Sequence, residues 1–285
     1  MRQRKPKSPY ERLRALCLHN CISLMVKAAR REVRGFLIAI INRLIFFKIM
    51  SKGNSYYEMN RDVFKNFVAR EREFVRNVGE AFRKERVFIS QGNKKVGDVP
   101  SVSLLPVIDC GNCSKCKRSC YDLRHDIIMK ECLATRAVNS LICKHERERY
   151  FAEIDDYLAK HLRPAFRFHI GGDIVDDDYF ARMVELSRKH RKIDFLVFTK
   201  MFHVVNGWIG TNGDLPPNLH VIFSGWIGLK MDNPYNLPTA HPIIDGVTSA
   251  PDGAKYCTGN CTECYKEDRM CWTMGKGESI LFAAH

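Results

Sequence analysis

Cysteine spacing is the feature of this 285-residue sequence that most restricts its fold and chemistry. Eight of the twelve cysteines form two groups of four. The first group is Cys110, Cys113, Cys116 and Cys120, and the second is Cys257, Cys261, Cys264 and Cys271. Disulfide scaffolds are usually shorter, secreted chains, whereas closely spaced cysteines can converge on one metal ion or cluster. We therefore interpret both groups as thiolate metal ligands.

The spacing within each group is compatible with more than one metal. The first group reads C-x2-C-x2-C-x3-C, which is the spacing of bacterial ferredoxins, where three cysteines hold one iron–sulfur cluster. The second group begins C-x3-C-x2-C, and its fourth cysteine follows after six intervening residues. Either quartet is also compatible with a tetrahedral zinc site, or with plain reduced cysteines or disulfides. Iron–sulfur is our leading expectation, with zinc as the alternative.

Two further cysteines lie outside the groups, on a helical stretch. Cys132 and Cys143 occur singly within the predicted helix at 126–146. An unligated cysteine packs as a small apolar group. We expect both to be core residues.

Alternating strand and helix patterns place the chain in the α/β class. Helical periodicity runs through residues 57–86, 126–146 and 148–162, and a shorter helix is expected through Val205. Short apolar runs predict strands at 101–108, 165–170, 193–200, 219–225, 241–250 and the end of the chain. We expect parallel (βα) units forming a full or partial TIM-like barrel, or alternatively an open doubly wound sheet.

Polar residues at the ends of the predicted strands are the candidate site residues. Gly171, Gly172 and Asp173 follow one strand, and Lys200 ends the next. In parallel sheets functional residues gather at the carboxyl ends of the strands, so we expect both cysteine groups to meet there too. Asp173 and Lys200 are the candidate catalytic residues. The alternatives are a tight glycine turn and a solvated lysine.

The positive charge is concentrated in the first 49 residues. They carry twelve Lys/Arg and two acids, for +10 of the formal +14. This segment is interpreted as a surface-binding amphipathic helix, a helix packed on the main domain, or a stretch preceding a true start at Met50. Its apolar run is too short to span a bilayer. The domains expected are a leader at 1–49, a helical segment at 50–100 and a metal-binding α/β domain at 101–285.

The order of motifs resembles the phage gene product 88 domain family over roughly residues 100–285. Cys116, Cys120 and Tyr121 match its C-x3-C-Y element, and the stretch from Arg167 to Asp173 resembles its second-strand element. Cys264, Cys271 and Trp272 resemble its terminal element. The resemblance implies an origin in a phage or mobile element and a cytoplasmic setting. It does not supply a reaction.

A second resemblance is to radical S-adenosylmethionine enzymes, which are partial (βα) barrels. They carry a C-x3-C-x2-C loop after the first strand and a GGE-like turn after the second. The resemblance implies that Gly171, Gly172 and Asp173 would hold the amino acid end of S-adenosylmethionine. In this chain the C-x3-C-x2-C element lies near the C-terminus instead.

The sequence therefore predicts an iron–sulfur protein with radical S-adenosylmethionine-like or redox activity on an unidentified small-molecule or macromolecular substrate. The alternative is a zinc-stabilised binding protein without catalysis. Nucleic acid is the candidate partner for that alternative, because Lys115, Lys117 and Arg118 lie within the first cysteine group. Residues 50–285 carry a net charge of only +4, so electrostatics alone gives nucleic acid little support.

Overall fold

The computed structural model describes residues 58–93, 96–112, 115–257, 259–267 and 269–283. The basic leader at 1–49, the Met50 start and Cys113 therefore lie outside the described residues. Within these residues, no helix is long and apolar enough to cross a membrane.

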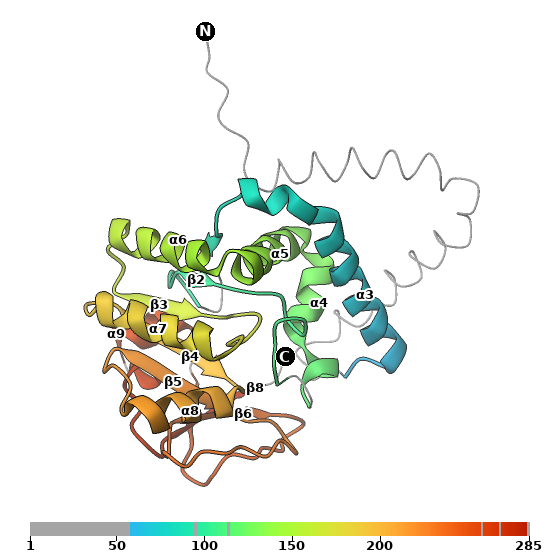
Figure 1. Ribbon diagram of the computed structural model, residues 1–285. Helices are drawn as coiled ribbons and strands as arrows, with labels where there is room; N and C mark the ends of the chain where they lie inside the picture. The colour runs from blue at the N-terminus through green and yellow to red at the C-terminus, as the bar shows by residue number, and fades with distance from the viewer. Residues whose placement is uncertain (1–57, 94–95, 113–114, 258, 268, 284–285) are drawn as a thin grey trace, which may run out of the picture. The chain divides into compact units, whose positions relative to one another are not determined.

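The centre of the molecule is an eight-stranded, mostly parallel sheet (Figure 1). Its order is β1-β2-β3-β4-β5-β6-β8-β7, and β1 is antiparallel to β2. The strands are β1 (Ile89–Ser90), β2 (Ser101–Val102), β3 (Ala165–Phe168), β4 (Asp194–Thr199), β5 (Leu219–Ser224), β6 (Thr239–Ile243), β7 (Lys255–Tyr256) and β8 (Ser279–Ala283). Among the described residues the two edge strands do not pair with each other, so the sheet is open. The parallel α/β class is confirmed, whereas barrel closure is not.

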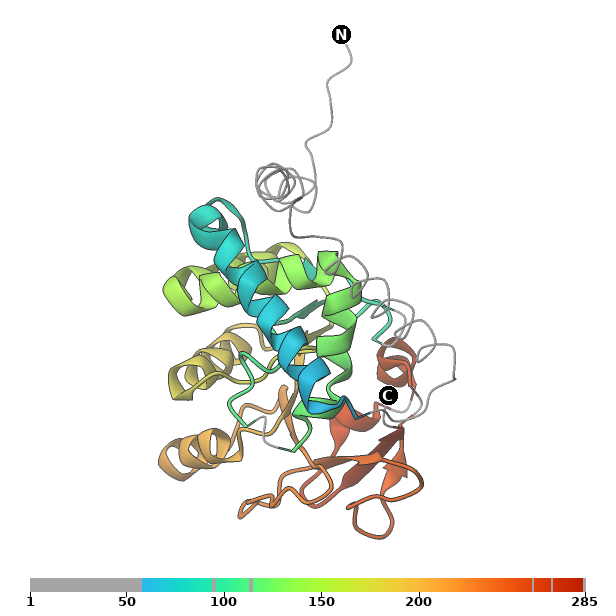
Figure 2. The ribbon, with the colours of Figure 1, turned by 90° about the vertical axis from the view of Figure 1, so that its right-hand side faces the viewer.

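Helices between successive strands cover one face of the sheet. They are α4 (Tyr121–Ile128), α5 (Lys130–His145), α6 (Arg147–Lys160), α7 (Asp177–Lys189) and α8 (Phe202–Asn212). Asp176 caps α7 by accepting a hydrogen bond from the backbone N–H of Tyr179 at 2.9 Å, which satisfies a donor of the first turn. Figure 2 shows α7 and α8 on one side of the strands and the C-terminal helices on the other.

The opposite face is covered by two short helices, α9 (Cys261–Lys266) and α10 (Met270–Thr273). The strands present small and aliphatic residues to this face, and Cys271 and Trp272 pack against them. The strand residues are Ala165, Leu196, Ile222, Ala240 and Ile280. Trp272 is 1% exposed. Burial of a large apolar side chain contributes about 1.5–3 kcal/mol, so this contact anchors helices too short to be stable alone.

The N-terminal helix α3 (Arg61–Val78) packs against α4 and α5. Asn60 caps it through hydrogen bonds from Asp62 and Val63, and the α-helix ends at Gly79, which has a φ of 46°. A 3-10 turn at Gly79–Lys84 follows, so the predicted helix over 57–86 is shorter and broken at the glycine.

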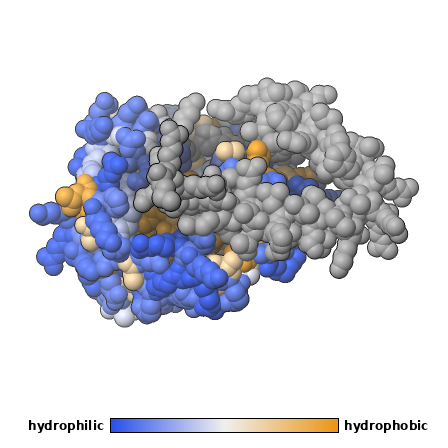
Figure 3. Space-filling view, turned by 90° about the horizontal axis from the view of Figure 1, so that it is seen from above, coloured by the Kyte–Doolittle hydropathy of each residue, from blue (hydrophilic) through white to orange (hydrophobic). Residues whose placement is uncertain are grey.

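The coloured surface in Figure 3 is mostly hydrophilic, with scattered hydrophobic residues.

The turn after β3 requires glycine for two steric reasons. Gly172 has a φ of 82°, and a Cβ there would lie 2.7 Å from the Cβ of Leu104. The preceding residue, Gly171, accepts a hydrogen bond from the backbone N–H of Leu104 at 2.9 Å. This close approach fixes the turn against the chain that follows β2.

We predict that Gly172→Ala destabilises the protein by about 1–3 kcal/mol, because it combines a positive φ with a clash against the Cβ of Leu104. The measurement is urea unfolding monitored by circular dichroism. Gly207→Ala in α8 is the matched control, since no atom lies within 4 Å of a Cβ at Gly207. Equal stability of the two variants would contradict the steric account.

Candidate functional site

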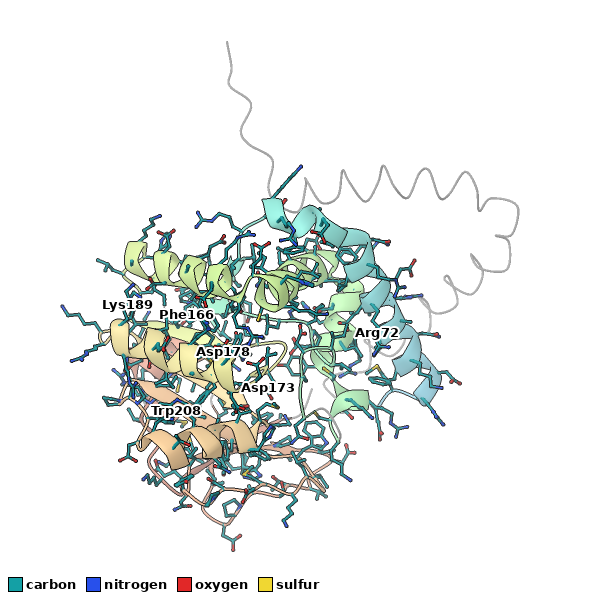
Figure 4. The ribbon with its side chains drawn as sticks, viewed as in Figure 1. Arg72, Phe166, Asp173, Asp178, Lys189 and Trp208 are labelled. Carbon is teal, nitrogen blue, oxygen red and sulfur yellow. The ribbon has the colours of Figure 1, made fainter. Side chains whose placement is uncertain are left out.

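Asp173 joins the carboxyl ends of β3 and β4. Its Oδ1 accepts hydrogen bonds from Thr199 Oγ1 at 2.6 Å and from the backbone N–H of Ile174 at 2.7 Å. Its Oδ2 accepts from the backbone N–H of Lys200 at 2.9 Å. Figure 4 shows Asp173 on the same side as Asp178 at the start of α7, with Lys189 at the opposite end.

The two candidate catalytic residues are neighbours in space with different environments. Burial raises the pKa of Asp173, and the hydrogen bonds from Thr199 and Lys200 partly oppose that shift. Lys200 Nζ donates to Ser224 Oγ at 3.0 Å and lies 5.9 Å from the ring centre of Trp226. Because both oxygens of Asp173 already accept hydrogen bonds, its visible role is to position the Lys200 backbone. A catalytic role for either residue stays a prediction.

A buried ion triad lies directly behind the glycine turn. Arg136 on α5 donates to Asp122 Oδ1 at 2.8 Å and to Asp126 Oδ1 at 2.7 Å, both on α4. All three side chains are buried. A Cβ at Gly171 would lie 2.7 Å from the guanidinium carbon of Arg136, so a side chain there would displace the guanidinium. The sequence signal for this triad is the i,i+4 pair of aspartates on one helix face, which the sequence analysis missed.

Glu71 on α3 is a further buried carboxyl group near this triad. It is 0% exposed, and neither of its oxygens has a hydrogen-bond partner. Burial raises its pKa to about 9, and the negative charge of Asp126 adds to the rise. Glu71 is therefore neutral at pH 7, which avoids the cost of an unpaired buried charge.

The described part of the first cysteine group lies near the carboxyl end of β4. Asn112, inside this group, donates its side-chain N–H to the Lys200 carbonyl oxygen at 3.0 Å. Cys120 caps α4, its Sγ accepting the backbone N–H of Leu123 at 3.4 Å. Burial raises the pKa of Cys120, and Asp122, Cys110 and Cys116 add to the rise because they are close to it. The structure therefore brings these three thiols into one region.

The second cysteine group is also gathered, on the face covered by α9 and α10. Burial raises the pKa of Cys271, and Cys257, Cys264 and Cys261 raise it further. Burial likewise raises the pKa of Cys264, whereas hydrogen bonds from the backbone N–H groups of Met270 and Cys271 lower it. These two contributions only partly oppose the rise in the pKa of Cys264.

The helices carrying the second group are anchored at the amino ends of the central strands. Tyr265 donates its hydroxyl to Asp194 Oδ2 at 2.8 Å, and Arg269 Nη2 donates to the same oxygen at 2.5 Å. Asp194 is the first residue of β4. The first group lies at the other end of that strand, so the expectation that both groups share one end of the sheet is not met. The C-terminal segment instead folds back over the uncovered face.

The described residues contain no disulfide, and no set of three or more His, Cys, Asp or Glu side chains in this part of the chain forms a metal-ready arrangement. Metal binding by either group therefore stays a prediction. Cys143 is buried, as expected of a core cysteine, and Cys132 is half-buried.

A family model described as Gene product 88 matches residues 80–240, which is more than half of the chain. The chain belongs to the Gene product 88 family. The match confirms the resemblance drawn from the motifs, and it includes the first cysteine group and the Gly171–Asp173 turn. The second cysteine group follows the matched segment. Neither a curated protein nor a solved structure matches the chain significantly.

We predict that Arg136→Met destabilises this Gene product 88 protein by about 3–5 kcal/mol, because two buried aspartates lose their shared counter-charge. Urea unfolding measures the change. Arg86→Met is the matched control, since Arg86 pairs with Asp156 while its side chain is 68% exposed, and such pairs contribute about 0–1 kcal/mol. A loss for Arg136→Met as small as the control would contradict the role of the triad.

Glu71 gives a signed prediction for pH. The unfolded chain ionises this residue near pH 4.5, whereas the folded protein keeps it protonated up to about pH 9. Folding stability from this residue therefore falls as pH rises through that interval. Glu71→Gln should reduce the fall in folding stability between pH 5 and pH 8.5. The variant should therefore be more stable than the unmodified protein near pH 8.5. Exposed Glu73→Gln on the same helix serves as the control. Identical pH profiles for Glu71→Gln and the unmodified protein would refute the assignment.

Proposed function

We propose that this protein is a cysteine-ligated metalloprotein whose principal centre is the second cysteine group. The observation that carries the proposal is the gathering of Cys257, Cys261, Cys264 and Cys271 on one face of the sheet. Cys264 accepts two backbone N–H bonds there, and Arg167 Nη1 lies 3.6 Å from Cys261 Sγ. Backbone and guanidinium donors of this kind suit thiolates, so the donor set fits a metal in type.

Electrostatics supports a cation at this position. Four thiolates placed together in a partly buried site repel one another, and burial adds to the cost of ionising them. A bound metal removes that cost, because a coordinating thiol is deprotonated outright. The N–H groups of Met270 and Cys271 then hold Cys264 in its ligating orientation, and Trp272 shields the buried side from water.

We favour an iron–sulfur cluster over zinc, on the spacing of the two cysteine groups. Such a cluster supplies one-electron transfer when bound. The parallel strands β2 to β6 lie in sequence order across the sheet, as strands do in (βα) barrels, and this supports redox or radical S-adenosylmethionine-like chemistry as the finer version of the proposal. We place this chemistry in the cytoplasm, where thiols stay reduced.

A zinc-stabilised binding protein is the second candidate, and one observation favours it. α9 and α10 are only six and four residues long, and Cys271 lies within the core cluster. A metal that joins these helices would contribute directly to folding, as structural zinc does. Lys117 and Arg118 near the first group are exposed and would then be candidates for contact with nucleic acid.

Anaerobic purification followed by metal analysis separates the two candidates. We expect a brown protein that contains iron and absorbs near about 400 nm. A colourless protein with stoichiometric zinc would overturn the iron–sulfur assignment, and a metal-free protein would overturn both. If iron is present, reductive cleavage of S-adenosylmethionine tests the radical version.

Substitution locates the metal. We predict that Cys264→Ser lowers the metal content of the purified protein and destabilises it, because the sulfur with two N–H donors is lost. Cys132→Ser is the matched control, since Cys132 is also half-buried but belongs to neither group. Inductively coupled plasma analysis gives the stoichiometry. Unchanged metal content in Cys264→Ser would exclude the second group as the principal centre.

A further inference from the structure

A cavity of about 420 Å³ lies beside β2 and β3, and Asp173 and Lys200 are not among its lining residues. Its walls come from β2 and β3, from α4 and α5, and from the segment before β2. The volume falls in the range of about 300–1,000 Å³ typical of small-molecule sites. Part of the cavity wall is apolar and comes from Phe88, Val96 and Ile170. The cavity therefore suits a ligand with an apolar body.

Two neighbouring residues in the wall of this cavity each carry a buried polar atom without a hydrogen-bond partner. Ser101 and Arg167 are directly opposite each other in the parallel pairing of β2 with β3, and both line the cavity. Ser101 is 1% exposed, and its buried hydroxyl has no partner. The buried Nε of Arg167 also has none. Buried polar groups are normally satisfied, so this adjacent pair of donors indicates a missing acceptor.

The cavity is also lined by a cation, Arg167, that pairs with no carboxylate among the described residues. Arg136 pairs with Asp122 and Asp126, and burial lowers the pKa of His125. Arg167 forms no ion pair with any described carboxylate. Its guanidinium lies 5.0 Å from the ring centre of Phe198 and reaches Cys261 through Nη1, which leaves Nε facing no acceptor. An anionic group on a ligand would supply the charged partner that Arg167 lacks among the described residues.

We propose that this cavity binds a small organic molecule through one carboxylate, held by Arg167 and Ser101. Guanidinium donors match the geometry of a carboxylate, and the serine hydroxyl supplies a further donor to the same group. The apolar body of the ligand lies against Phe88, Val96 and Ile170. This site goes beyond the proposed metal centre and needs no metal to form.

Probe binding tests the charge requirement on the full-length protein. Benzoate, its neutral counterpart benzamide and the dianion benzylphosphonate are titrated by isothermal calorimetry and ligand-observed NMR. We expect benzoate to bind about ten-fold or more tightly than benzamide, because hydrogen bonds to charged groups are the stronger ones. Equal affinities, tighter binding of the phosphonate, or no binding of any two- to eight-carbon carboxylate at about 10 mM would overturn the proposal.

Variants test the two donors. Arg167→Gln should weaken benzoate binding about ten-fold or more, and Ser101→Ala by a smaller factor. Ser101→Ala removes a hydroxyl that has no hydrogen-bond partner, so it should leave the free energy of unfolding unchanged. This variant therefore still tests the site if Arg167→Gln folds poorly. Exposed Arg163→Gln just before β3 is the matched control and should bind benzoate normally. Undiminished binding in both Arg167→Gln and Ser101→Ala would refute the site.

Metal content measured in the same samples keeps the two proposals apart. A metal-free protein that binds benzoate through Ser101 supports the carboxylate site and removes the metal function. A metal-loaded protein that binds no carboxylate supports the metal function and removes the carboxylate site.

Discussion

The ion triad of Arg136, Asp122 and Asp126 sets the position of most of the candidate site. It locks α4 to α5 inside the protein, where charges are costly unless they are paired. The guanidinium also fills the space beside Gly171, so the turn after β3 packs directly on it. Because Cys120 caps the first turn of α4, the same triad fixes one end of the first cysteine group. Glu71 adds no charge to this interior because its raised pKa keeps it neutral.

Local patterns in the sequence were sufficient for most of the strands and helices, but not for the two-residue strands β1 and β7. The runs at 165–170, 193–200 and 219–225 became β3, β4 and β5, because short apolar runs between turn signals have few other stable solutions. The run at 101–108 yielded only Ser101–Val102, since the chain leaves the sheet to meet the glycine turn. α8 extends to Asn212, beyond its predicted end at Val205, across Gly207 and Gly210. Glycine weakens a helix without forbidding it when tertiary packing compensates.

The parts of the site that depend on long-range packing could not be predicted in this way. The i,i+4 aspartates of α4 reveal a charged helix face, but nothing local indicates that Arg136 meets them inside the protein. The second cysteine group posed the same difficulty. Its position after a predicted strand suggested the carboxyl end of the sheet, yet Tyr265 and Arg269 bind Asp194 at the amino end of β4. An open sheet needs a cover for its second face, and that global requirement determined the path of the C-terminal segment.

Arg167 connects the two sites proposed for this protein. Strand alternation points it to the face opposite Phe166 and Phe168, where it meets Cys261 on one side and the cavity on the other. A guanidinium has donors on separate nitrogens, so it can contact a thiolate and a carboxylate at once. A thiolate at Cys261 and a carboxylate in the cavity would each be a partly buried negative charge. Such a charge is costly unless a cation lies next to it, and Arg167 supplies that cation to both. The two proposals together therefore predict an electrostatic link between the ligand and the second cysteine group, carried by this one strand residue.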